Sequence, residues 1–262
     1  MRENDRKSPR PGGRKSSGAD ERNHAKTLAA QVRSLVADYP DTIRLASDRV
    51  LFLNRIERLA ALIVFWGVRM NLTAEPGNPG ELAFHIIDSV IPLISADGEE
   101  FLRPAFRAGS QVLDLGSGAG FPALVLASAS RANFTLIESR RKRSSFLAVA
   151  AAEMNLKNVV VESRRVEQNR ANSGRSGKST GASVGQFDVV TARAFALPST
   201  LHSLAGSALK SGGIGMLYAN PGQNLALPDA VKNGLHEFRL VPYRIPRGDR
   251  VVERILGLWR RR

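Results

Sequence analysis

The segment VLDLGSGAGFP, residues Val112–Pro122, combines the residue types of a nucleotide-binding turn. An apolar strand ends in an acid, and closely spaced glycines then lead into an apolar helical pattern. The glycines alternate with other residues: Gly116, Gly118 and Gly120. Glycine lets the chain bend tightly and lets a ligand approach the backbone where a Cβ atom would block it. The segment therefore predicts a small-molecule site at the end of a strand.

Two residues of this segment discriminate between ligands. Phe121 occupies the position of the third glycine in the dinucleotide fingerprint Gly-x-Gly-x-x-Gly. Asp114 precedes the turn, where its charge would repel a pyrophosphate. A ligand with a cationic amine and an adenosine tolerates that acid and needs no phosphate cradle. We favour S-adenosylmethionine for this reason, and a nicotinamide cofactor remains open as the alternative.

Glu138 ends the next apolar run, 24 residues after Asp114. An acid at the end of the second strand conventionally accepts hydrogen bonds from the ribose hydroxyls of a bound nucleotide. The alternative is a surface acid that pairs with Arg140 or Arg141. We favour the ribose contact.

A compact basic cluster follows at the start of an expected helix: Arg140, Arg141, Lys142 and Arg143. The helix dipole disfavours positive charge there by a few tenths of a kcal/mol for each residue. Contact with RNA phosphates would account for both the concentration and the placement of these charges. A solvated helix face is the alternative.

His85 and Asp88 lie three residues apart on one face of an expected helix. This spacing could serve a metal or an acid–base pair. A helical pair without further ligands is more often a local hydrogen bond, so we expect a packing or interface role and no metal site.

The elements that position these residues follow from periodicity. Between Thr27 and about Phe106 the apolar residues recur at helical spacing, and Pro76–Gly80 separates two of the helices. After Gly109, short apolar runs alternate with helical segments, which is typical of βαβ units and a parallel sheet. The expected fold class is therefore α/β.

The composition predicts a division into four parts. Residues 1–26 contain almost no apolar side chains and are expected to form a disordered basic arm. Residues 27–108 form a helical extension, and residues 109–262 form the α/β domain. A stretch rich in Gly, Ser, Asn and Arg at 168–186 interrupts that domain as a flexible insert.

The net charge of +14 indicates a polyanionic partner, and its location restricts where that partner binds. Residues 1–26, 139–144, 163–180 and 257–262 carry +4, +4, +4 and +3, so the remaining chain is nearly neutral. The absence of cysteine excludes disulfides, thiolate metal sites and cysteine nucleophiles. The longest apolar run, Leu59–Trp66, is far shorter than the roughly 20 residues of a membrane span. We expect a soluble cytoplasmic protein that does not enter a membrane.

Six separated segments together resemble the RsmG (GidB) family of bacterial 16S rRNA guanine-N7 methyltransferases. They occur in the family's order over about residues 50–220: MNLTA (Met70–Ala74), HIIDS (His85–Ser89), LDLGSGAGFP (Leu113–Pro122), TLIESRRKRSSFL (Thr135–Leu147), SRRVE (Ser163–Glu167) and ARAF (Ala192–Phe195). The resemblance implies a doubly wound, Rossmann-like methyltransferase sheet with an N-terminal helical extension. It also implies 16S rRNA or the small ribosomal subunit as the partner, and we expect a monomer.

The resemblance also assigns roles to single residues. It implies that Gly116 and Phe121 bind S-adenosylmethionine and that Val166 and Glu167 line the adenine pocket. It implies that Arg193, just beyond an expected strand, contacts cofactor or substrate, whereas a strand-end salt bridge is the alternative. The long insert, the basic arm and Ala123 in place of a glycine depart from the family's pattern.

Guanine N7 suits a site without cysteine, because its in-plane lone pair can attack a methyl group without first losing a proton. Methylation at C5 of a pyrimidine would require thiolate addition, and radical chemistry would require a cysteine-bound cluster. Three alternatives stay open: a small-molecule methyltransferase, a nicotinamide oxidoreductase and a non-enzymatic RNA-binding assembly factor.

Overall fold

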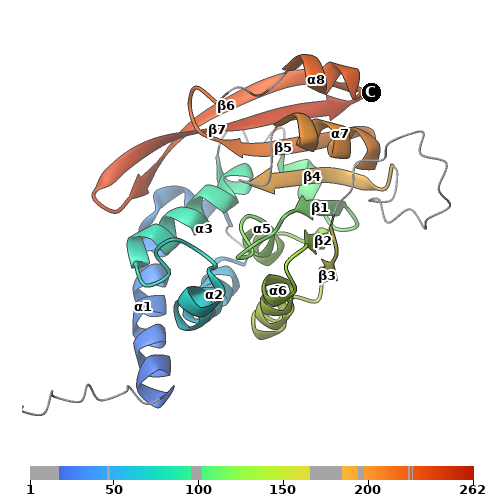
Figure 1. Ribbon diagram of the computed structural model, residues 1–262. Coiled ribbons are helices and arrows are strands. Elements are labelled where there is room, and N and C mark those ends of the chain that lie inside the picture. The colour runs from blue at the N-terminus through green and yellow to red at the C-terminus, as the bar shows by residue number, and fades with distance from the viewer. Residues whose placement is uncertain are drawn as a thin grey trace, which may run out of the picture.

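The computed structural model describes residues 18–45, 48–95, 102–165, 185–193, 198–223, 225 and 227–262. A single twisted sheet lies between two layers of helices (Figure 1). The seven strands are β1 (Gln111–Leu115), β2 (Asn133–Glu138), β3 (Val159–Ser163), β4 (Phe187–Arg193), β5 (Leu209–Ala219), β6 (Leu235–Arg247) and β7 (Arg250–Arg261). The expected α/β class with a helical N-terminal part is confirmed.

The strand order places a ligand crevice at one edge of the sheet. The order is β3-β2-β1-β4-β5-β7-β6, with parallel pairing from β3 to β5 and antiparallel pairing of β7 with both β5 and β6. The order reverses between β1 and β4. In open α/β sheets, ligands bind outside the carboxyl ends of the strands at such a reversal. The glycine turn that follows β1 and Arg193 at the end of β4 both lie at this edge.

One face of the sheet is covered by the N-terminal helices and by the helices that follow β1 and β2 (Figure 1). These elements are α1 (Gly18–Asp38), η1 (Pro40–Leu45), α2 (Arg49–Met70), α3 (Pro79–Ile94), η2 (Arg103–Phe106), α5 (Ala123–Ala129) and α6 (Arg141–Glu153). The opposite face is covered by α7 (Pro198–Ala208) and α8 (Leu227–Lys232).

Helix α3 is the central element of the first layer, because it lies against α1, α5 and the hairpin strand β6. Asn78 begins the helix, and its side-chain oxygen accepts a hydrogen bond from the Glu81 amide. Twelve of its sixteen residues are buried, including the polar residues Asp88 and Ser89. A helix buried on nearly every side has to direct its polar groups toward partners inside the protein.

The predicted disordered arm is wrong for residues 18–26, since α1 begins at Gly18 rather than near residue 27. Ala25, Ala29 and Val32 are buried against α2 and α3, and Asp20 and Glu21 place favourable negative charge in the first turn. The apolar stripe of the helix is built partly from alanine, which composition alone does not separate from a polar arm. Residues 1–17 and most of the predicted insert, residues 168–184, lie outside the described part of the chain, and the remaining domain boundaries stay predictions.

Candidate active site

The glycine turn connects β1 to α5 through backbone conformations that favour glycine. Gly116, Gly118 and Gly120 have φ angles of 72°, 55° and 93°, in the left-handed region. A Cβ atom at Gly120 would lie 2.5 Å from Cδ1 of Leu124 in α5. The predicted glycines therefore allow both the bend of the turn and the close approach of the following helix.

Asp114, on β1, is a buried carboxyl group with one unused oxygen. Its Oδ1 accepts a hydrogen bond of 2.6 Å from Oγ1 of Thr191, whereas its buried Oδ2 has no hydrogen-bond partner among the described residues. Burial raises the pKa of Asp114 to about 6, although the nearby hydroxyls of Ser117 and Thr191 oppose this rise. A buried oxygen without a donor fits a site that receives a donor from a ligand.

Glu138 ends β2 beside the glycine turn, as the sequence predicted for a ribose-binding acid. Its Oε2 accepts from the Gly118 amide at 3.0 Å, and its Oε1 accepts from the Arg140 amide at 2.8 Å. The contact with Arg140 therefore involves the backbone rather than the guanidinium. A carboxylate offers about four lone-pair positions, so each oxygen keeps room for a ribose hydroxyl.

Arg193, the last residue of β4, is held by α3 and faces the turn. Its guanidinium donates to the His85 carbonyl at 3.2 Å and lies 3.2 Å from Oδ2 of Asp88. It also contacts Nδ1 of His85, and its central carbon lies 5.8 Å from the Phe121 ring centre. The strand-end ion pair weighed in the sequence analysis is present, and it fixes Arg193 next to the residues predicted to bind the cofactor.

Asp88 connects Arg193 to the C-terminal hairpin. This carboxylate is fully buried, and its Oδ1 accepts from the Tyr243 hydroxyl at 2.6 Å and from Nε of Arg254 at 3.2 Å. Sequence reasoning gave His85 and Asp88 only a packing or interface role and missed their contact with Arg193. The available signal was the pair His85 and Asp88 within a mostly apolar helix.

The other titratable groups of this network are poor proton donors and acceptors near neutral pH. Burial, reinforced by Arg193, lowers the pKa of His85 to about 3, so the imidazole is neutral. Burial and the charge of Asp88 raise the pKa of Tyr243. Burial raises the pKa of Tyr218 well above its ordinary value, and the Tyr218 hydroxyl donates to the Ser89 carbonyl at 2.7 Å. The network therefore holds positions rather than relaying protons.

A cavity of about 490 Å³ opens next to Arg193 at the carboxyl ends of β4 and β5. Residues of α3, the strand ends and the β6–β7 hairpin line it: Phe84, His85, Arg193, Leu217, Tyr218, Asn220, Gln223, Arg247, Val252, Glu253 and Arg254. Arg247 fixes the hairpin to α3 through two hydrogen bonds to Glu81, of 2.7 and 3.0 Å. The hairpin thus forms one wall of this cavity.

The predicted basic cluster lies at the start of α6, near the glycine turn. Arg140, Arg141 and Lys142 are exposed. Arg143 is half-buried, and its guanidinium donates to the carbonyl of Asn71, which ends α2. Three of the four residues are thus available to a partner, whereas Arg143 joins two helices. Val166 and Glu167, predicted to line an adenine pocket, lie outside the described residues.

Comparison with known proteins places this site in a family. Residues 53–226, about two thirds of the chain, match the family described as GidB, rRNA small subunit methyltransferase G. The chain belongs to this family. The expected family, its rRNA methyltransferase activity and its S-adenosylmethionine cofactor are thereby confirmed, and the roles of single residues remain predictions.

Individual relatives agree with the family. The chain is 36% identical over 154 residues to a ribosomal RNA small subunit methyltransferase G from Wolinella succinogenes, covering 58% of this chain and 67% of the relative. It is 37% identical over 182 residues to the same enzyme from Acidiphilium cryptum, covering 68% and 72%. A solved structure from Galdieria sulphuraria, described as a putative sarcosine dimethylglycine methyltransferase, shares the fold with a TM-score of 0.50 at 11% identity, covering 70% of this chain and 88% of that one.

Two further observations concern metals and membranes. Within the described ranges, no three His, Cys, Asp or Glu side chains gather as a metal site. Along the same residues, no helix combines the length and the apolar character that crossing a membrane requires.

Proposed function

We propose that this chain transfers the methyl group of S-adenosylmethionine to N7 of a guanine in 16S rRNA. The observation that carries the proposal is the arrangement at the carboxyl edge of the sheet. A glycine turn with an unused buried carboxylate oxygen lies beside Arg193 and a cavity, and the titratable groups around Arg193 are locked in hydrogen bonds.

The cofactor would be held by three features of the chain. The glycine turn allows close approach to the backbone, the free oxygen of Asp114 accepts a donor, and Glu138 accepts from ribose hydroxyls. When bound, S-adenosylmethionine supplies an electrophilic methyl group on a sulfonium. Val166 and Glu167, which lie outside the described residues, remain predicted to line the adenine pocket.

The network around Arg193 suits an acceptor that needs no base. Guanine N7 carries a lone pair in the ring plane, so no proton has to leave before methyl transfer. The neutral His85 accepts a contact from Arg193, and the Tyr243 hydroxyl is bonded to Asp88. The residues can therefore contribute by orienting the guanine and by excluding water. In well-aligned intramolecular reactions, orientation alone corresponds to effective molarities of about 10⁵ to 10⁸ M.

Arg193 is proposed to orient the acceptor through guanine O6 or a neighbouring phosphate. The usual arginine fork contacts both O6 and N7 and would block the attacking atom. The adjacent cavity of about 490 Å³ is within the size range of small-molecule pockets and can admit one base. The guanine has to leave its stack or lie in a loop to enter it.

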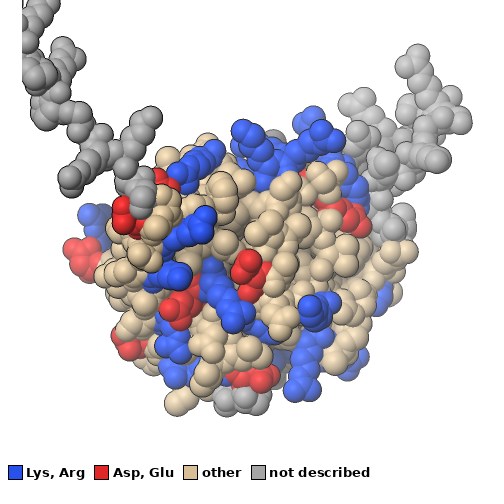
Figure 2. All heavy atoms as spheres, turned by 90° about the horizontal axis from the view of Figure 1, so that it is seen from below, with Lys and Arg blue, Asp and Glu red and all other residues tan. Residues whose placement is uncertain are grey.

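The RNA contact near the site is assigned to Arg140, Arg141 and Lys142, which are exposed. Arg143 was predicted to join them, but its bond to Asn71 makes it a weaker candidate. Figure 2 shows that on the face seen from below Lys and Arg are spread out, with acids among them. Electrostatic attraction there is therefore expected to be distributed over several contacts rather than one patch. A cytoplasmic monomer that acts on 16S rRNA or the small subunit completes the proposal.

The deciding experiment compares rRNA nucleosides from a deletion strain and its parent by mass spectrometry. Loss of a single 7-methylguanosine from 16S rRNA, restored by the wild-type gene, is the expected result. An unchanged nucleoside profile would refute the proposed target. Methyl transfer to free guanine nucleotides as fast as to rRNA would favour the small-molecule alternative, and a lack of transfer to any RNA would favour the assembly factor.

The cofactor site is tested separately by calorimetry on Gly116→Arg. A long side chain in the turn should abolish S-adenosylmethionine binding, since it occupies the space where the ligand approaches the backbone. Wild-type affinity in this variant would refute the site.

A further inference from the structure

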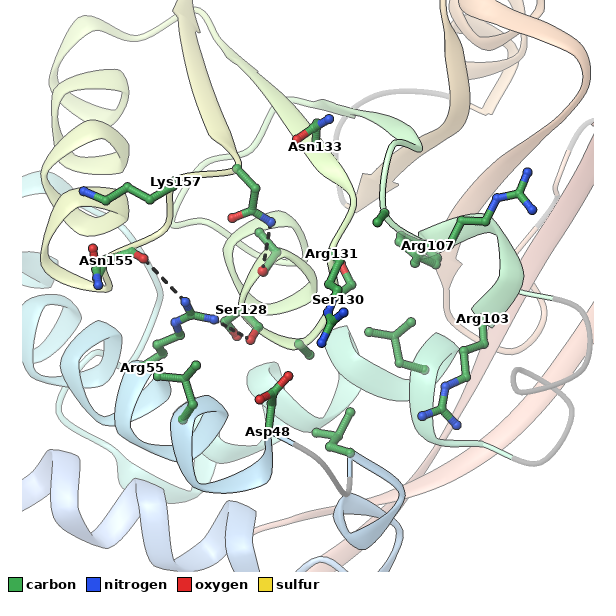
Figure 3. A pocket seen from close by; sticks show the side chains of 18 residues that line it. Asp48, Arg55, Arg103, Arg107, Ser128, Ser130, Arg131, Asn133, Asn155 and Lys157 are labelled. Atoms are coloured by element: carbon green, nitrogen blue, oxygen red, sulfur yellow. Dashed lines mark hydrogen bonds between the residues drawn. The ribbon is translucent and has the colours of Figure 1, made fainter.

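A second and larger cavity, of about 770 Å³, lies at the opposite edge of the sheet, where β1, β2 and β3 begin (Figure 3). Its walls come from α2, from the segment before β1 and from the turns that precede β2 and β3. Five cations and one acid among the described residues line it: Arg55, Arg103, Arg107, Arg131, Lys157 and Asp48. None of these residues was singled out by the sequence analysis.

Arg55 belongs to the wall of this cavity. It donates to the carbonyl of Ser128 in α5 at 3.1 Å and to the carbonyl of Asn155, just after α6, at 3.4 Å. Both carbonyls lie at helix C-termini, where a cation is favourable. Partial burial lowers the pKa of Arg55, and the nearby Asp48 opposes that change. Arg55 and Asp48 thus offset each other, and the remaining lining charge is positive.

The four other cations of the lining are exposed, and the contacts of the described residues give two of them no structural role. Arg103 donates to the carbonyl of Arg44 at 3.2 Å. Burial opposes the lowered pKa of Asp188, which is due mainly to Lys210 and the Gln111 amide, and Arg107 adds to it. Within the described ranges, neither Arg131 nor Lys157 has a hydrogen bond or an ion pair. Gathering like charges opposes folding. A binding partner would explain why these cations are placed together.

Uncharged donors complete the cavity. Ser130 contributes a buried hydroxyl that has no hydrogen-bond partner in the part of the chain that is described. Asn133 and Asn155 add exposed amides beside Arg131 and Lys157. Arginine and lysine with hydroxyl and amide donors are the groups that contact phosphate oxygens in protein–nucleic acid complexes.

The arrangement favours an extended polyanion over a free nucleotide. In Figure 3, Arg103 and Arg131 extend toward the middle of the cavity, whereas Arg107 and Lys157 point outward on opposite sides. Among the described residues that line the cavity, the aromatic one, Phe106, is buried and offers no stacking surface for a base. A strand with several phosphates can offer a separate phosphate to each of the four cations.

We propose that this amino-edge pocket binds backbone phosphates of the rRNA substrate, as a contact separate from the methyl-transfer site. The inference rests on the proposed function for the identity of the RNA. The five residues of β1 separate the two edges by about 17 Å at the usual rise of a strand. Phosphate contacts fix orientation without reading sequence, so anchoring at both edges would orient the RNA across the protein.

The test compares two double variants of equal charge. Arg131→Gln/Lys157→Gln removes two cations from the pocket, and Lys26→Gln/Arg250→Gln removes two exposed cations from α1 and β7. Binding to an unmodified 16S rRNA transcript is measured at several salt concentrations. The slope of log K against log salt should flatten by about 1.4 to 1.8 in the pocket variant, which is about 0.7 to 0.9 per lost phosphate contact. The slope of the control variant should flatten by less than half of this amount.

Each outcome separates this proposal from the proposed function. Equal slopes in the two variants overturn the pocket even if the wild-type enzyme methylates rRNA. A flattened slope in the pocket variant alone supports the pocket even if no methyl transfer is found. Calorimetry with S-adenosylmethionine should give the same affinity in wild type and both variants, and Arg131→Lys should keep the wild-type slope. If the pocket variant loses binding of ATP but keeps the slope for RNA, the site binds a small anion and the proposal is wrong.

Discussion

The cavities at the two edges of the sheet differ in how their arginine and lysine side chains are held. At the carboxyl edge, the Arg193 and Arg254 side chains are 12% and 11% exposed and both lie against the fully buried carboxylate of Asp88. At the amino edge, Arg131 and Lys157 are exposed beside an open cavity. An arginine that is buried and paired fixes the geometry of a site. Cations that are exposed and gathered attract anions, and this attraction weakens as the salt concentration rises.

This difference has an energetic consequence. Removing one member of a buried charge network leaves the others without a partner in a medium of low dielectric constant. Removing an exposed cation leaves water to take its place. Removing a charge should therefore change the free energy of unfolding much more at the Asp88 network than at the exposed cations of the amino-edge pocket.

The largest effect is expected for Asp88→Asn. Loss of the carboxylate leaves two buried guanidinium groups unpaired, which should lower the free energy of unfolding by about 3 to 5 kcal/mol. Urea denaturation measures this value. The matched control is Glu253→Gln on the hairpin, where the pair with Arg244 has side chains 61% and 72% exposed and should contribute no more than about 1 kcal/mol. Similar losses in the two variants would contradict the contrast between buried and exposed pairs.

The next effect concerns Asp114, whose buried carboxyl has a pKa raised from 3.8 to about 6. A raised pKa adds stability below the unfolded value, and that stability is lost as the pH rises through about 6. Without cofactor, Asp114→Asn should therefore be more stable than wild type at pH 7 by about 2 to 3 kcal/mol, and the difference should vanish near pH 4. Its affinity for S-adenosylmethionine should fall. Unfolding at a series of pH values checks this, and a pH-independent difference would refute the ionisation.

His85 should show the opposite dependence, because burial lowers its pKa to about 3. Its stabilising contribution is present above pH 6.5 and is lost as the pH falls toward 3. In His85→Gln, the acid-induced loss of stability should be shallower between these values. The exposed His24 is the control, and His24→Gln should keep the wild-type slope. Parallel curves for all three proteins would contradict a neutral, buried His85.

A smaller effect distinguishes two glycines with similar backbones at opposite edges. Gly109 precedes β1 with φ of 88°, and a Cβ atom there would meet no atom within 4 Å. Gly120 has φ of 93°, and a Cβ atom there would collide with Leu124. Gly109→Ala carries only the backbone strain, of about 1 to 2 kcal/mol. Gly120→Ala should add about 1 to 3 kcal/mol of overpacking and weaken cofactor binding. Thermal unfolding and calorimetry measure the two effects, and equal losses of stability would show that Leu124 moves aside.

The smallest effect is expected at the amino-edge pocket. Arg131→Gln and Lys157→Gln should each change the free energy of unfolding by no more than about 0.5 kcal/mol. Arg55→Gln should cost about 1 to 3 kcal/mol, because it removes charged hydrogen bonds to two helix ends. Urea denaturation of the three single variants suffices. A large loss on removing Arg131 would assign it a structural role and weaken the pocket.

The sequence predicted the parts of the site that depend on local pattern. Asp114, the glycine turn and Glu138 stand at strand ends, where the alternation and spacing of residue types are enough to reveal them. The strands around them were confirmed for the same reason. The α/β class and the family followed from several such segments in sequence.

The parts that failed depend on contacts between distant segments. The role of Asp88 is visible only when Arg193, Tyr243 and Arg254 are brought to it, and no local pattern predicts that. The amino-edge pocket combines cations from separate segments for the same reason. The start of α1 failed differently, since Ala25 and its polar neighbours resemble a polar arm until the face that Ala25 packs against is known.

The Asp88 network also constrains the order in which the protein folds. Its bonds to Tyr243 and Arg254 join residues 155 and 166 positions apart in the chain. The entropy cost of closing loops of that length has to be met before these contacts can stabilise the protein. Such non-local contacts therefore slow folding. The carboxylate that pairs with Arg193 therefore gains all of its partners only when the C-terminal hairpin docks on α3. Chains that have completed β1 to β4 but not this step already contain the glycine turn, yet the carboxylate of Asp88 still lacks its contacts with Tyr243 and Arg254.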